Sequence, residues 1–174
     1  VVDAPVAWSS GNRLTFDSGN NITVNQSLDG PGAEIVFGLG YVNDPLFGGQ
    51  ATTGNLTVDA AATVRADQVV IRRNPNVALG GNLPDGPMGG ISVDGVLEAD
   101  VLDFQLTDVD PIFSPIRGGV QGPVTIDNPG NRIGTLRSTG SGGVFLDDVT
   151  ITDGDGGLTL DGRFDLDGGA FTVS

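Results

Sequence analysis

Short apolar–polar–apolar triplets recur along almost the whole chain. In the stretch GNLTVDAAATVRADQVVIRR, residues 54–73, the triplets Leu56-Thr57-Val58, Ala62-Thr63-Val64 and Val69-Val70-Ile71 are separated by small or acidic residues. Side chains alternate along a strand, so the outer residues of a simple triplet share one face and the central residue points the other way. No window has apolar residues at helical spacing, so the pattern predicts strands and little helix.

The spacing of the triplets distinguishes between all-β folds. Sandwiches and barrels use strands of about five or six residues with turns every 8 to 12. Here triplets start at 56, 62 and 69, and again at 91, 96 and 101. Such short strands suit a solenoid, in which about 20 residues complete one coil and the next coil stacks about 4.8 Å away. Further triplets follow the same pattern: Leu14–Phe16, Ile22–Val24, Glu34–Phe37, Val124–Ile126, Ile133–Leu136, Val144–Leu146, Val149–Ile151, Leu158–Leu160, Phe164–Leu166 and Phe171–Val173.

We therefore predict a single domain over residues 1–174, an all-β fold of the right-handed parallel β-helix type with short three-residue strands. Two Pro- and Gly-rich stretches, 74–89 and 105–123, interrupt the rhythm and are expected to leave the coil as loops. The segment 1–12, which holds the only Trp, is expected to be an N-terminal cap or a linker.

Composition agrees with a thin, turn-rich β protein. Gly accounts for 29 residues and Pro for 10, aromatic residues for only 6%, and nearly all acid is Asp, a turn residue. The net charge of -14 opposes binding to nucleic acid and to anionic membranes. No apolar run is long enough to span a bilayer, so membrane insertion is not expected. The chain starts without Met and without a secretory leader, which predicts a processed chain or a segment of a longer one.

Threonine occupies the centre of many triplets. Two interpretations are open: an exposed hydroxyl array of the ice-binding kind, or the ordinary preference of β-branched Thr for exposed strand positions. The ice-binding type requires two outward Thr flanking an inward residue, and each triplet here offers one. The pattern therefore favours the second interpretation. The residues concerned are Thr15, Thr23, Thr57, Thr63, Thr125, Thr150, Thr159 and Thr172.

Acidic turns near the C-terminus are the only candidate metal site. Asp153 and Asp155, and then Asp165 and Asp167, stand in Asp-x-Asp-Gly-Gly patterns whose oxygen atoms suit Ca²⁺. Neither pattern is a complete EF-hand loop, and Asp-Gly is also common tight-turn chemistry. The cofactor expectation is therefore either none or Ca²⁺.

Catalysis is not expected. His and Cys are absent, which removes the usual nucleophile–base pairs. Asp147 and Asp148 are adjacent and point to opposite faces of a strand, and no Lys or His accompanies the pair Asp165 and Asp167. We predict no catalytic residue.

Two further kinds of surface site are suggested by the sequence. Three aromatic residues in or beside the non-coil stretches, Tyr41, Phe47 and Phe113, are the candidates for stacking on a sugar. Asn21, Asn25 and Asn55 match the glycosylation acceptor pattern, which a turn Asn followed by a strand Thr or Ser also produces by itself.

Several longer phrases resemble one family. The stretches LTFDSGNNITVNQSLDGPGAEIVFGLG, GNLTVDAAATVRADQVVI and NRIGTLRSTGSGGVFLDDVTITDGDGGLTLDG are similar to the β-helical repeats of filamentous-haemagglutinin-type exoproteins, which are secreted by the two-partner route. Asn74-Pro75-Asn76-Val77 resembles a short motif of that family's secretion domain, although the companion Asn-Pro-Asn-Gly-Ile is missing. The resemblance implies a secreted, extracellular adhesin or filament on the cell surface of a Gram-negative bacterium.

The termini add an expectation about partners. No amphipathic capping helix is recognisable at either end, and the last triplet, Phe171–Val173, runs to the final residue. Open solenoid ends expose unpaired strand edges. We therefore expect protomers to stack end to end into a fibre, or the coil to continue in a longer rod. The alternatives are a carbohydrate-binding or carbohydrate-cleaving β-helix of the tailspike kind, with surface glycans as partners, and a calcium-stiffened surface-layer module.

Overall fold

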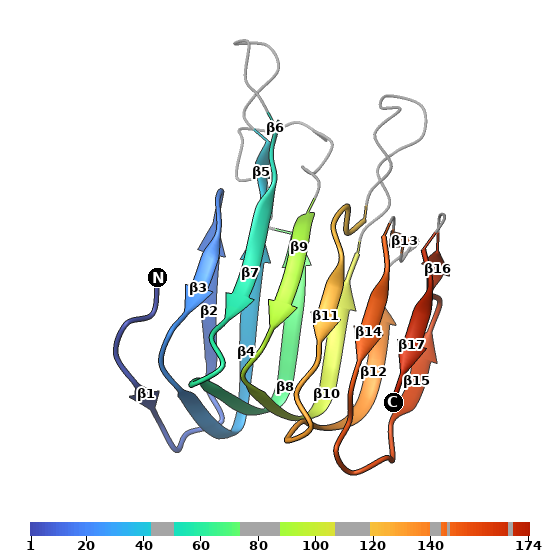
Figure 1. The fold of residues 1–174 in the computed structure, drawn as a ribbon. Coiled ribbons are helices and arrows are strands. Elements are labelled where there is room, and N and C mark those ends of the chain that lie inside the picture. The colour runs from blue at the N-terminus through green and yellow to red at the C-terminus, as the bar shows by residue number, and fades with distance from the viewer. Residues whose placement is uncertain (43–50, 74–87, 107–118, 140–143, 146, 167–168) are drawn as a thin grey trace.

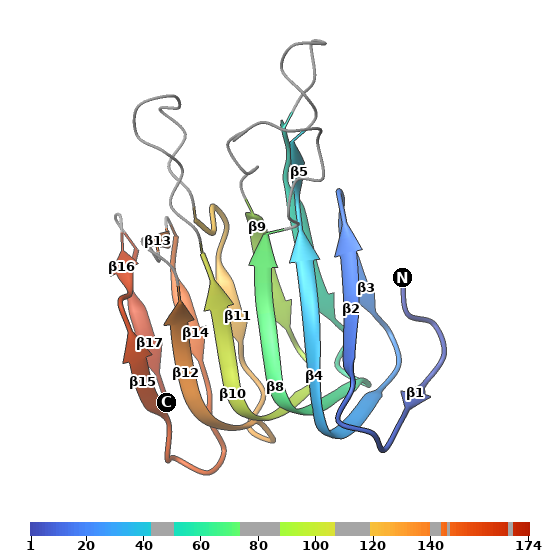
Figure 2. The ribbon, with the colours of Figure 1, turned by 180° about the vertical axis from the view of Figure 1, so that it is seen from behind.

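The fold consists of parallel strands that stack coil upon coil. The computed structural model describes residues 1–42, 51–73, 88–106, 119–139, 144, 145, 147–166 and 169–174, and these ranges hold strands and turns but no helix. The described part of the chain accordingly has no helix that meets the length and apolarity of a membrane span. Two sheets face each other across a narrow aliphatic interior (Figures 1 and 2).

One sheet, which we call the long-strand sheet, has seven parallel strands. Its order is β1-β4-β8-β10-β12-β15, and β2 pairs with the second half of β4. These strands are β1 (Val6–Ala7), β2 (Arg13–Ser18), β4 (Leu28–Leu39), β8 (Thr63–Arg73), β10 (Val96–Gln105), β12 (Arg132–Thr139) and β15 (Thr159–Gly162).

The opposite sheet, the short-strand sheet, has six parallel strands in the order β17-β14-β11-β9-β7-β3. These are β3 (Ile22–Val24), β7 (Gly54–Val58), β9 (Met88–Val93), β11 (Val124–Ile126), β14 (Val149–Ile151) and β17 (Phe171–Val173). Two small pairs complete the set: β13 (Val144–Phe145) runs parallel to β16 (Asp165–Leu166), and β5 (Tyr41–Val42) runs antiparallel to β6 (Ala51–Thr52).

The chain alternates between the two sheets as it advances. In Figure 1 it descends along the short strands nearest the viewer, crosses at the bottom, and rises along the long strands behind. Because it advances from left to right at the same time, the coil is right-handed, and the opposite view in Figure 2 agrees. The predicted parallel β-helix is therefore confirmed.

Stacked rows of side chains make the core. Ile22, Leu56 and Ile91 lie in register on adjacent short strands, and each is 5% exposed or less. This row continues along the coil with Val124 and Val149, and such stacked Val, Ile and Leu side chains are why the interior needs few aromatic rings. The core runs as a narrow column along the coil axis.

Pairs of triplets join into single bent strands on the long-strand sheet. In β8, Val64 and Ala66 are buried, Asp67 is exposed, and the buried positions resume at Val69 and Ile71. This one-residue change of phase turns the chain through a corner while its pairing with β10 continues on both sides. The expectation of three-residue strands therefore holds for β3, β11, β14 and β17, whereas the long strands reach twelve residues.

The coil is also longer than the predicted 20 residues over most of its length. Stacked positions are 34 residues apart from Ile22 to Leu56 and shorten to 22 residues from Val149 to Phe171. The longer coils include the segments 43–50, 74–87 and 107–118, which lie outside the described residues.

The predicted excursions are shorter than their sequence boundaries. Met88 and Gly89 belong to β9, and Gln105 ends β10. Val120 is fully buried and forms parallel bridges with Met88 and Phe145. The edges of both stretches are therefore part of the coil, because their apolar residues continue a core row.

One corner of the interior is polar. Asn131 is fully buried and follows Leu97 in the row of Leu28 and Val64. Its Oδ1 accepts from the Leu97 N–H at 2.8 Å, and its Nδ2 donates to the carbonyls of Ile126 and Thr152 at 3.3 and 3.0 Å. The amide thus satisfies backbone groups of three chain segments, as a buried polar side chain must.

Candidate functional site

The C-terminal end of the coil exposes the residue types that earlier coils bury. Leu160 in β15 is 54% exposed, Leu166 in β16 is 37% exposed and Val173 in β17 is 44% exposed. We call this surface, with Leu158, Phe164 and Phe171 beside it, the C-terminal end face. Its backbone is open as well, because β15 and β17 are the edge strands of their sheets.

The rows show that this exposure is a property of position and not of residue type. Leu160 continues a row in which Ile35, Val69, Leu102 and Leu136 are each at most 1% exposed. Val173 likewise continues the row of Val24, Val58, Val93, Ile126 and Ile151, each at most 2% exposed. A further strand on each sheet would bury both side chains.

Aromatic rings lead from the core to the C-terminal end face. Phe104 meets the Phe145 ring edge-on with centroids 5.5 Å apart, and Phe145 stacks on Phe164 at 6.1 Å. Phe164 then contacts Phe171 at 5.7 Å. The rings of Phe164 and Phe171 are only partly buried, so part of their apolar surface remains exposed at this end.

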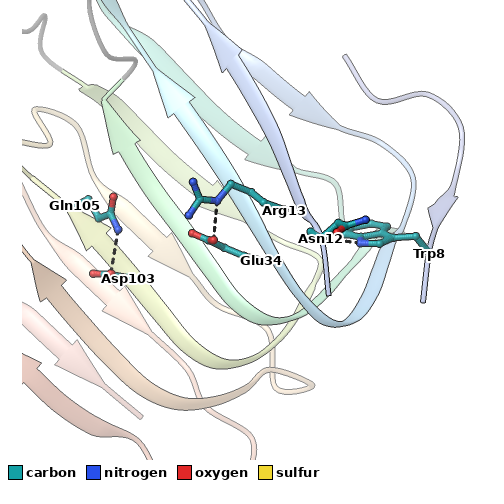
Figure 3. Close-up of polar contacts among 6 residues, drawn as sticks. All are labelled: Trp8, Asn12, Arg13, Glu34, Asp103 and Gln105. Carbon is teal, nitrogen blue, oxygen red and sulfur yellow. Dashed lines mark hydrogen bonds and ion pairs between the residues drawn. The ribbon is translucent and has the colours of Figure 1, made fainter. Parts of the chain in front are cut away.

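The N-terminal end is an incomplete coil whose segments pair in register. Val2 bridges Val24, β1 pairs with the start of β4, and β2 pairs with the end of β4. The Trp8 indole lies so close to Gly30 that a Cβ there would overlap the ring, and its N–H donates to the Asn12 carbonyl at 3.3 Å (Figure 3). Residues 1–12 thus extend the coil.

Charged side chains form a ladder at the outer corner of the long-strand sheet. In register, Asp29 neighbours Arg65, Arg65 neighbours Glu98, and Glu98 neighbours Arg132. Arg65 lies 3.6 Å from Asp29 and 3.5 Å from Glu98, and Arg132 pairs with Asp155. All of these residues except Asp29 line a cleft of about 430 Å³. Alternating signs fix the register of the coils, although exposed pairs contribute little stability.

Further polar contacts cross coils on the outer face of the same sheet. Arg13 of β2 donates to the Glu34 carboxylate of β4 at 2.7 Å, whereas Gln105 donates to Asp103 within β10 at 3.3 Å (Figure 3). The Asp103 carboxylate is 2% exposed and also accepts from the Thr139 hydroxyl at 3.0 Å. The Arg13–Glu34 and Thr139–Asp103 contacts each join neighbouring strands of the sheet.

The outer face of the short-strand sheet presents a hydroxyl ladder. Six rungs align in one row: Thr23, Thr57, Ser92, Thr125, Thr150 and Thr172. The triplet threonines Thr15, Thr63 and Thr159 lie on the other sheet, so the predicted row is divided between two faces. A shallow groove of about 590 Å³ runs beside the ladder, and Gly89, Gly90 and Gly122 in its lining have no side chains to fill it.

Of the four sequence-predicted calcium residues, the structure describes the side chains of Asp153 and Asp155. Asp153 is 6% exposed, and its two carboxylate oxygens accept the backbone N–H groups of Ile133 and Gly157 at 3.0 and 3.1 Å. Asp155 pairs with Arg132. Asp165 lies in β16, Asp167 falls outside the described residues, and no group of three metal-ligating side chains occurs in the ranges described.

The other predicted surface residues are placed as follows. Tyr41 opens the antiparallel pair β5 and β6, whereas Phe47 and Phe113 lie outside the described residues. Asn55 donates to Asn21 at 2.9 Å, and Asn25 donates to Asp3 at 2.7 Å, so the three acceptor asparagines take part in contacts between neighbouring coils. Their glycosylation stays a prediction.

Sequence reasoning missed the polar corner and the charge ladder. Asn131 stands between Gly130 and Arg132, where it looks like an ordinary turn residue. Its role depends on stacking under Leu97, which requires the register of coils 34 residues apart. The C-terminal end face did have a signal in the sequence, because the strand triplet Phe171–Val173 continues the coil pattern up to the last residues.

Comparison with known proteins identifies no relative: no family model, no curated protein and no solved structure matches the chain. The fold itself defines the class. All-parallel strands that alternate between two stacked sheets make the protein a β-solenoid of the parallel β-helix type.

Proposed function

We propose that this protein is a structural subunit of an extracellular adhesive or filamentous rod, which grows by end-to-end stacking of coils. The observation that carries the proposal is the C-terminal end face, where Leu160, Leu166 and Val173 continue buried rows and are 54%, 37% and 44% exposed. Exposed edge strands with apolar side chains are templates for further strand pairing. Contacts of this head-to-tail kind propagate without closing.

The proposed location outside the cell is supported by stretches of the chain's own sequence. The repeats around residues 54–71 and 131–162 resemble those of filamentous-haemagglutinin-type exoproteins, which act at the surface of Gram-negative bacteria. A secreted rod of that kind provides adhesion or matrix through its length and its lateral faces. The hydroxyl ladder and the charge ladder are the lateral faces here.

Charge sets the conditions under which stacking is favoured. The net charge of -14 makes two copies repel one another at low ionic strength. At 0.1 M salt the repulsion between charges more than about 10 Å apart is largely screened. Salt does not weaken the gain from burying aliphatic side chains. We therefore propose that stacking strengthens as salt rises.

The test is the assembly of the wild-type chain and of two end-face variants. Sedimentation velocity over a range of protein and salt concentrations is expected to show species that grow with both. Full burial of a leucine or valine side chain is worth about 1.5–3 kcal/mol, and stacking would bury the roughly half of Leu160 and Val173 that is still exposed. Leu160→Asp and Val173→Asp each remove this gain and place a charge in the contact. Each is therefore expected to weaken association about tenfold or more.

Thr125→Asp is the matched control. It adds the same charge at an outward position of β11, in the middle of the rod. It should assemble as wild type does, and negative-stain images of both should show rods. A wild-type chain that stays monomeric at every concentration and salt level would count against the proposed function.

A further inference from the structure

The N-terminal tripeptide lies on the edge of β3. The Val2 N–H donates to the Thr23 carbonyl at 2.8 Å, and the Asn25 N–H donates to the Val2 carbonyl at 3.0 Å. The Asn25 side chain donates to the Asp3 carboxylate at 2.7 Å, and the Val2 side chain is 9% exposed. Residues 1–3 therefore add a short strand to the end of the short-strand sheet.

The two ends of the rod match each other row by row. If the edge strand β15 of one copy lies beside β2 of a second copy, continued rows set Leu160 against the second copy's Leu14. Because each coil gives one strand to each sheet, β17 then falls beside β3 of the second copy. In that register Val173 meets the second copy's Val24, and Thr172 meets its Thr23. Aliphatic residues meet aliphatic residues, and the hydroxyl ladder continues.

Charge fits the same register. Thr159 lies against the second copy's Arg13, which places Asp161 diagonally from that guanidinium on the same face. The Asp161 side chain is 61% exposed and the Arg13 side chain is 63% exposed. Each is already paired within its own chain, Asp161 with Arg137 at 3.2 Å and Arg13 with Glu34 at 2.7 Å. Because more than half of each side chain is exposed, the two can also attract one another across the junction.

One element conflicts with this docking. The place that β17 takes beside the second copy's β3 is the place that residues 1–3 of that copy already occupy. The two strands cannot pair with the same edge at once.

We propose that residues 1–3 act as a displaceable strand, which blocks head-to-tail docking of a second copy of this chain until they leave β3. This inference rests on the proposed function, because it names the partner and the control of the same end-to-end contact. It follows that the N-terminal segment sets the concentration at which rods grow. Weakening its contacts lowers that concentration, and fixing it in place raises the concentration.

A disulfide lock tests the inference in the full chain. The pairing of Val2 with Val24 sets Asp3 opposite Asn25, and the chain contains no Cys of its own. Neighbouring strands are about 4.8 Å apart, which is within the Cα separation that a disulfide spans. The double variant Asp3→Cys, Asn25→Cys is therefore expected to tie the N-terminal segment to β3 when oxidised.

Sedimentation velocity of the oxidised and reduced forms gives the readout. The oxidised form is expected to need at least about tenfold more protein to assemble than the reduced form. The control Asp3→Ser, Asn25→Ser lacks the hydrogen bond between the two side chains, so it should assemble at lower concentration than wild type under either redox condition.

Each outcome separates the two proposals. A locked monomer beside a reduced form that assembles supports both. Equal assembly of the locked and reduced forms overturns the displaceable strand and leaves end-to-end stacking in place. Absence of assembly in every form, the serine control included, overturns both.

Discussion

Replacing Asn131 with leucine is expected to lower the free energy of unfolding by about 2–6 kcal/mol, although it places an aliphatic side chain in an aliphatic row. The substitution removes one acceptor and two donors from a fully buried site. The Leu97 N–H and the Thr152 carbonyl then lack partners, whereas the Ile126 carbonyl still accepts the Thr152 N–H at 2.9 Å. Each buried unsatisfied group costs about 1–3 kcal/mol.

Asn128→Ala is the control for Asn131→Leu. The Asn128 side chain also makes two hydrogen bonds to backbone, with Asp94 and Gly130, but it lies nearer the surface, where water replaces them. Its loss is expected to cost about 1 kcal/mol. Urea denaturation followed by circular dichroism measures both variants. An Asn131→Leu chain at least as stable as wild type would contradict the assignment of the polar corner.

Shortening Leu102 to alanine is expected to cost about 2–5 kcal/mol, because its side chain is fully buried in the middle of the column. Leu160→Ala makes the same chemical change in the same row, two coils further on. Because Leu160 is 54% exposed in the single chain, Leu160→Ala is expected to lower the free energy of unfolding by less than about 1 kcal/mol.

The comparison of these two variants has to be made on monomers. Stacking would bury Leu160 and raise the cost of its loss, so denaturation should be followed at low protein concentration and low salt. Under those conditions the difference between the two leucines measures the openness of the last coil. Equal losses of stability would show that Leu160 is covered in the single chain, and the C-terminal end face would not be open.

The sequence was sufficient to predict the solenoid because its local pattern and its packing agree. Triplets such as Leu56–Val58 have inward aliphatics and an outward Thr, and they stack as the alternation requires. The residues between triplets were predicted as turns. Asp67 and its counterpart Asp100 do change the direction of the chain, but they do so inside continuous strands.

What the sequence could not predict depends on contacts between distant coils. The register that brings Arg65 between Asp29 and Glu98 spans more than thirty residues on each side, and no local signal marks it. The N-terminal segment is similar: Val1–Asp3 has no strand pattern of its own, and its pairing with Thr23–Asn25 arises from the free edge of β3. Both features belong to the stacked structure.

The stacked rows are also the reason why we propose the ends of the rod, and not a pocket, as its functional part. Along its sides, charged and polar groups such as Arg72 and Asp17, 3.0 Å apart, pair with one another across coils. At the C-terminal end the same rows stop with exposed leucine and valine. Of the five exposed large hydrophobic side chains in the described residues, three lie in the last coil, and they support the proposed self-association.

Cysteine cross-linking tests that claim most directly. Thr23 and Thr172 stand at opposite ends of the hydroxyl ladder, five rungs or about 24 Å apart in one chain, which is too far for an internal disulfide. In the stacked register they are neighbours. A Thr23→Cys, Thr172→Cys chain, oxidised under assembly conditions, is expected to give a ladder of covalent multimers on a non-reducing gel. The control Thr57→Cys, Thr172→Cys, whose first cysteine lies inside the rod, should give none beyond the dimer. Equal patterns from the two variants would contradict end-to-end stacking in the register that joins β17 to β3 of the next copy.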